Sequence, residues 1–162
     1  MTELPQYRIV VQSSRRCLEQ VGPLVGGSWR RLDDELGREV SGELLIDTGA
    51  YGAMIDLEVA EALQLLPQGV REVHGIHGSG RLQLFLGQVS LPARDSDGNR
   101  ALYTAVIECV GVPSLRDKNH EHGVEIIGIL GRMFLRGSRL TIDGVSGIVE
   151  LELRADANNG EK

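Results

Sequence analysis

One acidic residue comes directly after an apolar run and directly before a tight turn. The run Leu44-Leu45-Ile46 leads into Asp47, Thr48, Gly49 and Ala50. This order predicts a buried strand that delivers the Asp47 carboxylate to a site at its end. Gly49 has no Cβ, so the chain can turn sharply and approach another group closely there. Such a carboxylate can exchange protons with water or with a substrate. The alternative is that Asp47 only caps the turn.

A second segment with a similar character lies closer to the C-terminus. It is an apolar run that ends in Gly-Arg, and it consists of Ile126, Ile127, Gly128, Ile129, Leu130, Gly131 and Arg132. Together the two segments resemble the aspartic proteases, specifically the retropepsin-like branch, in which Ala follows D-T-G and Gly-Arg follows an apolar strand. The resemblance covers roughly residues 40–151 and is strongest at these two segments.

The resemblance implies an all-β fold, a closed retropepsin-like barrel or sandwich with one or two short helices, and the activity of an aspartic endopeptidase on a polypeptide substrate. Asp47 would be the catalytic acid, supported by Thr48, Gly49 and Ala50 in its loop. In the family pattern the Gly49 N–H bonds the carboxylate, and Thr48 bonds its mate in a second chain. Ile129, Leu130 and Gly131 would pack beneath this loop.

Two departures from the family pattern concern the contacts of the acid loop. Arg132 matches the family's arginine on a closing helix, which normally pairs with an acid four residues after the catalytic aspartate. That position is Tyr51 here, so Arg132 needs another partner. The chain also continues past the closing helix with a hairpin that has an internal turn, which points to a differently built interface.

The single D-T-G motif has a consequence for assembly. The chemistry needs two carboxylates, one to activate water and one to protonate the substrate carbonyl. No other Asp of the chain begins such a motif, and 162 residues make one domain by the usual prior of about 100–200 residues. A protease built from this chain is therefore expected to be a symmetric homodimer with one Asp47 from each copy. Two carboxylates that face each other across the two-fold axis cannot both be ionised, so they share one proton, as is established for aspartic proteases.

A glycine-rich stretch separates two strand-like arms, residues 70–73 and 81–86. Three glycines in seven residues predict a hairpin tip. By resemblance this is the flap that covers the substrate and bonds it through backbone groups; the alternative is an ordinary hairpin turn. Its residues are His74, Gly75, Ile76, His77, Gly78, Ser79 and Gly80.

The remaining pattern indicates further strands and two short helices. Asp56 is a good N-cap for a helix over residues 57–65, and Pro67 would stop it. Residues 12–20 fit neither the helical nor the strand period. The other predicted elements are strands at 7–11, 24–32, 40–46 and 124–130, hairpins at 91–109 and 139–151, a polar loop at 111–123 and a helical turn at 132–135. We expect one domain over residues 1–153, with 1–23 as an N-terminal extension and 154–162 as a disordered tail.

Composition and spacing argue against several other classes of protein. The net charge of −6 gives no basic footprint for nucleic acid. No apolar run approaches the roughly 18 residues that span a membrane, and no secretory signal is evident. The two cysteines match no metal or redox spacing, so a cytoplasmic protein with reduced thiols is expected.

The histidines suggest a metal site but do not require one. His74 and His77 lie on one loop, and His120 and His122 on another, so a zinc site needs both loops to converge. We expect no metal and no cofactor. Two alternatives to the protease stay open: a catalytically silent retropepsin-like module for dimerisation or peptide binding, and a weaker one, a metal-dependent hydrolase. Trp29 is expected to lie in the core or at an interface.

Overall fold

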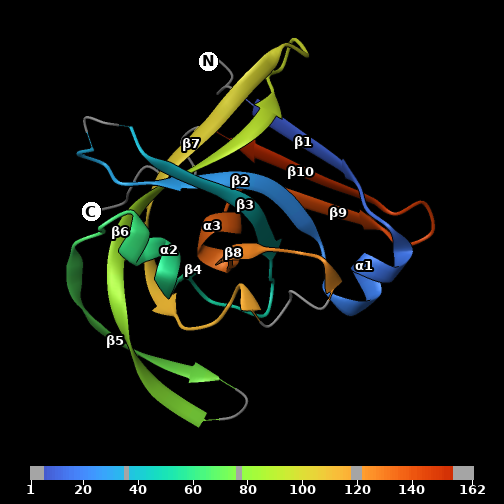
Figure 1. Cartoon of the computed structure of the whole chain (residues 1–162). Coiled ribbons are helices and arrows are strands. Elements are labelled where there is room, and N and C mark those ends of the chain that lie inside the picture. Colours follow the sequence, from blue (N-terminus) through green and yellow to red (C-terminus); the bar gives the residue numbers. More distant parts are fainter. Residues whose placement is uncertain (1–5, 35–36, 76–77, 118–121, 155–162) are drawn as a thin grey trace.

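The computed structural model describes residues 6–34, 37–75, 78–117 and 122–154, which form ten strands and three short helices (Figure 1). The strands are β1 (Gln6–Gln12), β2 (Leu24–Arg30), β3 (Glu39–Ile46), β4 (Ala53–Asp56), β5 (Pro67–Gly75), β6 (Gly78–Arg94), β7 (Arg100–Val112), β8 (Ile126–Leu130), β9 (Arg139–Asp143) and β10 (Ile148–Arg154). The helices are α1 (Arg15–Gln20), α2 (Leu57–Ala62) and α3 (Arg132–Leu135). The predicted all-β class is confirmed, with three short helices in the described residues where one or two were expected.

Six of the strands close into a barrel. They follow the order β2-β3-β8-β4-β7-β6, and β6 pairs back to β2 through Ser28–Arg30 against Gln88–Ser90. Most neighbours are antiparallel, but β3 runs parallel to β8 and β4 runs parallel to β7. The barrel is filled by fully buried apolar side chains such as Trp29, Leu44 and Ile55. Trp29 therefore lies in the core, and its Nε1–H is a buried donor without a partner among the described residues.

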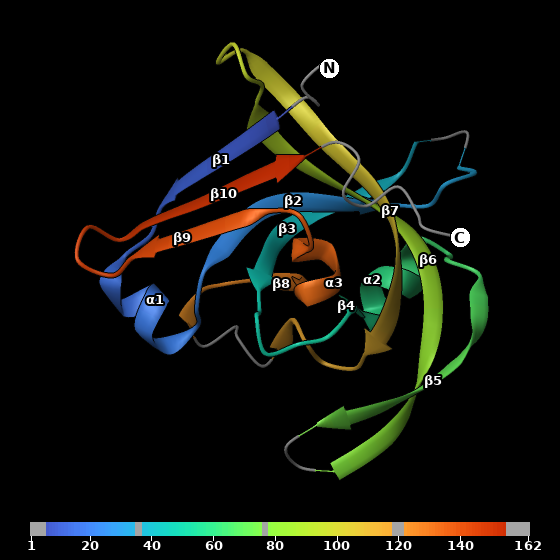
Figure 2. The ribbon, with the colours of Figure 1, turned by 180° about the vertical axis from the view of Figure 1, so that it is seen from behind.

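Three more strands extend the sheet away from the barrel. β1 pairs with β10 along its whole length, and β10 pairs with β9 (Figure 2). Among the described residues, the strand pairing of β1 with the barrel is limited to Arg8 against Arg94 on β6. This part contains the hairpin that continues past α3. Arg154 is the last residue of β10, opposite Gln6, so the predicted tail began one residue too early; its other residues lie outside those described.

Local chemistry explains where the short helices begin and end. The Asp56 carboxylate accepts hydrogen bonds from Glu58 N at 3.0 Å and Val59 N at 3.4 Å, which confirms the predicted N-cap of α2. The helix ends earlier than predicted, because Gln64 has φ +54° and Leu65 turns back into the core. Helix α1 was not predicted. It buries none of its residues fully, so it leaves no apolar period in the sequence.

Two hairpins share the long strand β6 and point to opposite ends of the molecule (Figure 1). At one end β6 pairs with β7 around the predicted turn at residues 95–99, where Asp95 Oδ1 accepts from Asp97 N and Asn99 N. At the other end it pairs with β5 in the predicted glycine-rich hairpin. Both strands of that hairpin are longer than predicted. No helix in the described part of the chain is long and apolar enough to cross a membrane.

Candidate active site

Asp47 is the first residue after β3, and its carboxylate is held by its own loop. The Gly49 N–H donates to Asp47 Oδ1 at 2.8 Å, the bond that the family pattern implied. The loop backbone is fixed in turn, because Asp47 N donates to Leu130 O at 3.1 Å and Ala50 N to Asp47 O at 3.2 Å. Asp47 is half-buried, whereas Thr48 and Gly49 are exposed. The carboxylate thus has a defined orientation at the surface of the chain.

The end of β8 lies directly under this loop. A Cβ on Gly131 would lie 2.7 Å from Ala50 O and closer still to Gly52 O, so only glycine fits. The following residues continue the contact, since Arg132 N donates to Ala50 O and Met133 N to Tyr51 O, both at 2.9 Å. The structure therefore brings the two sequence segments together, with Gly131 at the point of closest approach.

Residues Ile129 and Leu130 have different surroundings. Leu130 is fully buried in the main core beneath the loop, as predicted. Ile129 is half-buried and packs instead against a smaller apolar cluster of Leu24, Leu115 and Ile126. The expectation that both pack beneath the acid loop is thus correct only for Leu130, because successive side chains of a strand point to opposite faces.

The Arg132 side chain binds backbone carbonyls of the acid loop, a partner that the sequence did not reveal. Its Nη1 donates to Thr48 O at 2.7 Å and to Gly49 O at 2.8 Å. The guanidinium thus binds the acid loop through backbone carbonyls and needs no carboxylate at position 51. Tyr51 is free to face solvent, with 63% of its surface exposed.

A cavity of about 320 Å³ lies between the acid loop and the glycine-rich hairpin. Gly49, Ala50 and Arg132 line one side of it, and Val73 and His74 of β5 line the other. Of the described residues that were predicted to form the flap, His74 lines this cavity together with Gly49 and Ala50 of the acid loop, whereas Gly75, Gly78, Ser79 and Gly80 do not. The cavity is partly open to solvent.

The hairpin is paired in register almost to its tip. His74 lies opposite Ser79 and Gly75 opposite Gly78, and His74 Nδ1 is 2.7 Å from Ser79 Oγ. The described tip residues His74, Gly75, Gly78, Ser79 and Gly80 are all exposed. Ile76 and His77, which were also predicted to contact substrate, lie outside the described residues.

Sequence reasoning missed Arg71 as a residue of the site. It lines the cavity from β5 and forms an ion pair with Glu108 on β7, with Nη2 and Oε2 2.7 Å apart. The two residues are far apart in the chain, so no local motif connects them. The only available signal was that Arg71 lies two residues before Val73 in a predicted strand, so that both side chains share its half-buried face.

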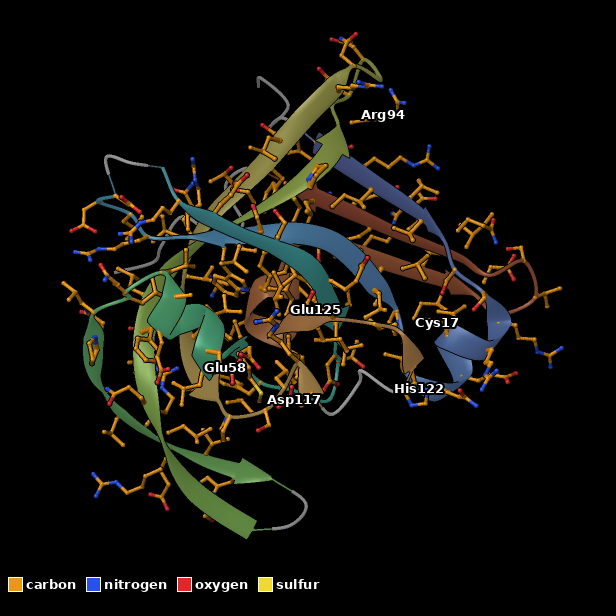
Figure 3. All side chains as sticks on the ribbon, viewed as in Figure 1. Cys17, Glu58, Arg94, Asp117, His122 and Glu125 are labelled. Carbon is orange, nitrogen blue, oxygen red and sulfur yellow. The ribbon has the colours of Figure 1, made fainter. Side chains whose placement is uncertain are left out.

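The other side chains that could act as nucleophiles or metal ligands are either buried or distant from the cavity beneath the hairpin. Burial of Cys109 on β7, with a smaller effect from Glu108, raises the pKa of its thiol to about 12, so it is not a nucleophile at neutral pH. Cys17 and His122 lie near α1, away from the hairpin (Figure 3). Within the described residues no three His, Cys, Asp or Glu side chains gather closely enough to hold a metal ion. His77 and His120 of the metal hypothesis are not among them.

Comparison with known proteins gives no assignment: no protein-family model matches the chain, and no curated protein matches its sequence. The geometry of the acid loop, its clamp and the facing hairpin therefore has to carry the functional argument.

Proposed function

We propose that this chain is a homodimeric aspartic endopeptidase of the retropepsin-like type. One observation carries the proposal. The Asp47 carboxylate is held by the Gly49 N–H at 2.8 Å in a loop whose next residues line a cavity beneath a glycine-rich hairpin. An oriented carboxylate, a cleft and a covering hairpin are the parts that peptide hydrolysis by activated water requires.

The second carboxylate comes from a second copy of the chain. Thr48 and Gly49 are exposed in the acid loop, and Tyr51 beside it exposes 63% of its surface. Packing of two copies around a two-fold axis at this loop covers Thr48 and Gly49 and part of the Tyr51 ring. The same packing brings the two Asp47 residues together and lets Thr48 bond its mate.

In the dimer the two Asp47 carboxylates hold one proton between them. The ionised member removes a proton from water as the water oxygen attacks the peptide carbonyl carbon, and the protonated member gives its proton to the carbonyl oxygen. The resulting gem-diol then returns a hydroxyl proton to the carboxylate that protonated the carbonyl oxygen. At the same time the peptide nitrogen takes the proton that the other carboxylate had removed from water. The C–N bond then breaks and both products leave. The glycines of the hairpin let its backbone donors approach the peptide closely.

Asp47→Asn tests the acid. The amide has the same shape and can still accept the Gly49 N–H bond, so the fold is retained, but it cannot take a proton from water. We expect cleavage of a denatured protein substrate to fall at least about 1,000-fold, with an unchanged thermal midpoint. Undiminished cleavage by the variant would show that the mechanism is wrong.

A dilution series separates the enzyme from the rival, a catalytically silent module for dimerisation or peptide binding. Half a site is inactive, so activity per chain should fall as sedimentation shows the dimer dissociating. A monomeric preparation with full specific activity would contradict the two-chain site. A stable dimer that cleaves no denatured protein between about pH 3 and pH 7, a range that spans the usual carboxyl and imidazole titrations, would support the silent module.

A further inference from the structure

A second cavity adjoins the one beneath the hairpin. It has a volume of about 420 Å³ and shares Tyr51, Gly52, Ala53 and Arg71 with the first as lining residues. Its own walls come from β7 and from α3 with the residues that follow it. The two cavities therefore adjoin at Tyr51, and a polypeptide that extends past Tyr51 from the first cavity reaches the second.

The walls of this second cavity suit a side chain with an apolar stem and a charged end. Val106 on β7 and Met133 on α3 expose 41% and 42% of their surface, although both are apolar. Their exposure leaves apolar area that a ligand's methylene groups can cover.

The charges of the cavity leave one cation uncompensated. Arg71 and Glu108 neutralise each other, since their charged atoms are 2.7 Å apart. Arg136 also lines the cavity, and it forms no ion pair within the described part of the chain. Because Arg71 and Glu108 cancel, the lining carries one net positive charge, supplied by Arg136.

We propose that this cavity is an outer subsite that takes an acidic side chain, Asp or Glu, of the polypeptide substrate, with Arg136 as the residue that selects it. The proposal rests on the proposed peptidase function and deepens it. An extended peptide advances about 3.3 Å per residue, and alternate side chains point the same way. The acidic residue therefore lies a few residues from the bond that is cleaved, not next to it.

Two matched decapeptide libraries test the subsite. Each has apolar residues at the two central positions, and the libraries differ only in carrying Glu or Gln at one position, placed in turn two to five residues from the centre. At one position the native protein should cleave the Glu library about two- to fivefold faster, the range expected for one exposed ion pair. The preference should vanish in about 1 M salt, where the screening length falls to about 3 Å.

Arginine variants assign the preference to a residue. Arg136→Gln should cleave both libraries at equal rates, and Arg136→Glu should prefer the Gln library. Arg100→Gln is the matched control, because Arg100 is also exposed and without an ion pair in the described residues. Arg100 pairs with Arg94, which lies at the end of the molecule opposite the hairpin (Figure 3). A Glu preference that survives Arg136→Gln, or no preference at any position, would overturn the subsite.

A binding measurement keeps this proposal separate from the proposed function. Immobilised Asp47→Asn protein should retain more of the Glu library than of the Gln library, and Arg136→Gln should abolish the difference. If the native protein cleaves nothing but this retention holds, the subsite stands and the peptidase falls. Equal retention of both libraries overturns the subsite whatever the activity. Weakened self-association of Arg136→Glu without any library preference would assign the cavity to the dimer interface instead.

Discussion

Glycine occurs both beneath the acid loop and in the β5–β6 hairpin, but Gly131 and Gly80 have opposite surroundings. At Gly131, under the acid loop, an added Cβ would collide with the carbonyl oxygens of Ala50 and Gly52. At Gly80, in the hairpin, an added Cβ would meet nothing within 4 Å. The first glycine permits close packing, whereas the second keeps a surface thin and open.

The same contrast holds for hydrogen bonds. The carbonyls of residues 48 to 51 each accept a bond from Arg132 or Met133, so the acid loop is tied to a second element along its length. The described hairpin residues near the tip form strand pairs only with each other. Glycine content therefore says little about rigidity, and the contacts made by each glycine decide it.

The largest effect is expected for Gly131→Ala. Its φ of −90° suits alanine, so the whole effect comes from the collision with two backbone oxygens that cannot move cheaply. We expect the free energy of unfolding to fall by about 3 kcal/mol, the upper end for overpacking, and cleavage to be lost. Urea denaturation with a cleavage assay measures both quantities.

Gly80→Ala is the matched control for that substitution, because its Cβ enters open space. Its unfolding free energy should stay within about 0.5 kcal/mol of the native value. Equal destabilisation by the two alanine variants would remove the distinction between a packed glycine and an open one.

The double substitution Gly78→Val and Gly80→Val should damage activity more than stability. Gly78 has φ +121°, which valine adopts only under strain, and both branched side chains would crowd a bound peptide. We expect turnover to fall by roughly tenfold to a hundredfold, with only a small drop in thermal midpoint, because the barrel does not depend on the tip. Unchanged turnover in the same preparation would mean that the hairpin does not cover the substrate.

Arg132→Met should have an intermediate effect. It removes the charged donor from Thr48 O and Gly49 O but leaves the backbone bonds from α3 intact. Because the site is exposed, we expect a loss of only about 1 kcal/mol in stability and about fivefold in turnover. Urea unfolding and initial rates measure them, with Arg100→Met as the control. Full activity would show that α3 alone holds the loop.

The smallest effect is expected far from both regions, at the pair between β1 and β10. Two nitrogens of Arg8 donate to the Glu150 carboxylate at 2.6 and 2.8 Å, and these bonds hold the pKa of Glu150 below its usual value. A lowered folded-state pKa stabilises the fold above the unfolded value of about 4.5. That contribution is lost as the pH falls through the folded-state pKa. The free energy of unfolding, measured with urea from about pH 6 to pH 3, should depend less on pH in Glu150→Gln than in the native protein. An identical pH dependence would mean that the pair does not affect stability.

The sequence was sufficient to predict the elements whose residues form a strong local pattern. Asp47 and Arg132 were singled out as parts of one site because their two segments resemble the pattern of one family, and in the structure Arg132 does bind the loop that follows Asp47. The partner of Arg132 was not predictable, since backbone carbonyls are present at every position and leave no trace in the sequence. The Arg71–Glu108 pair was missed for a related reason: it depends on the register of β6 against both neighbours.

Strand β6 has a mechanical consequence for the hairpin. From Gly78 to Gln83 it pairs only with β5, and from Leu84 onward it also pairs with β7. On the other strand the register shifts between Pro67 and Gly69, and Gly69 has φ +142°. The side chain of Gln83 donates to Gly69 O, so the place where β6 gains β7 as a neighbour lies opposite the register shift of β5. A load applied at the tip therefore bends the hairpin across one line from Gly69 to Leu84, and the barrel behind that line stays closed.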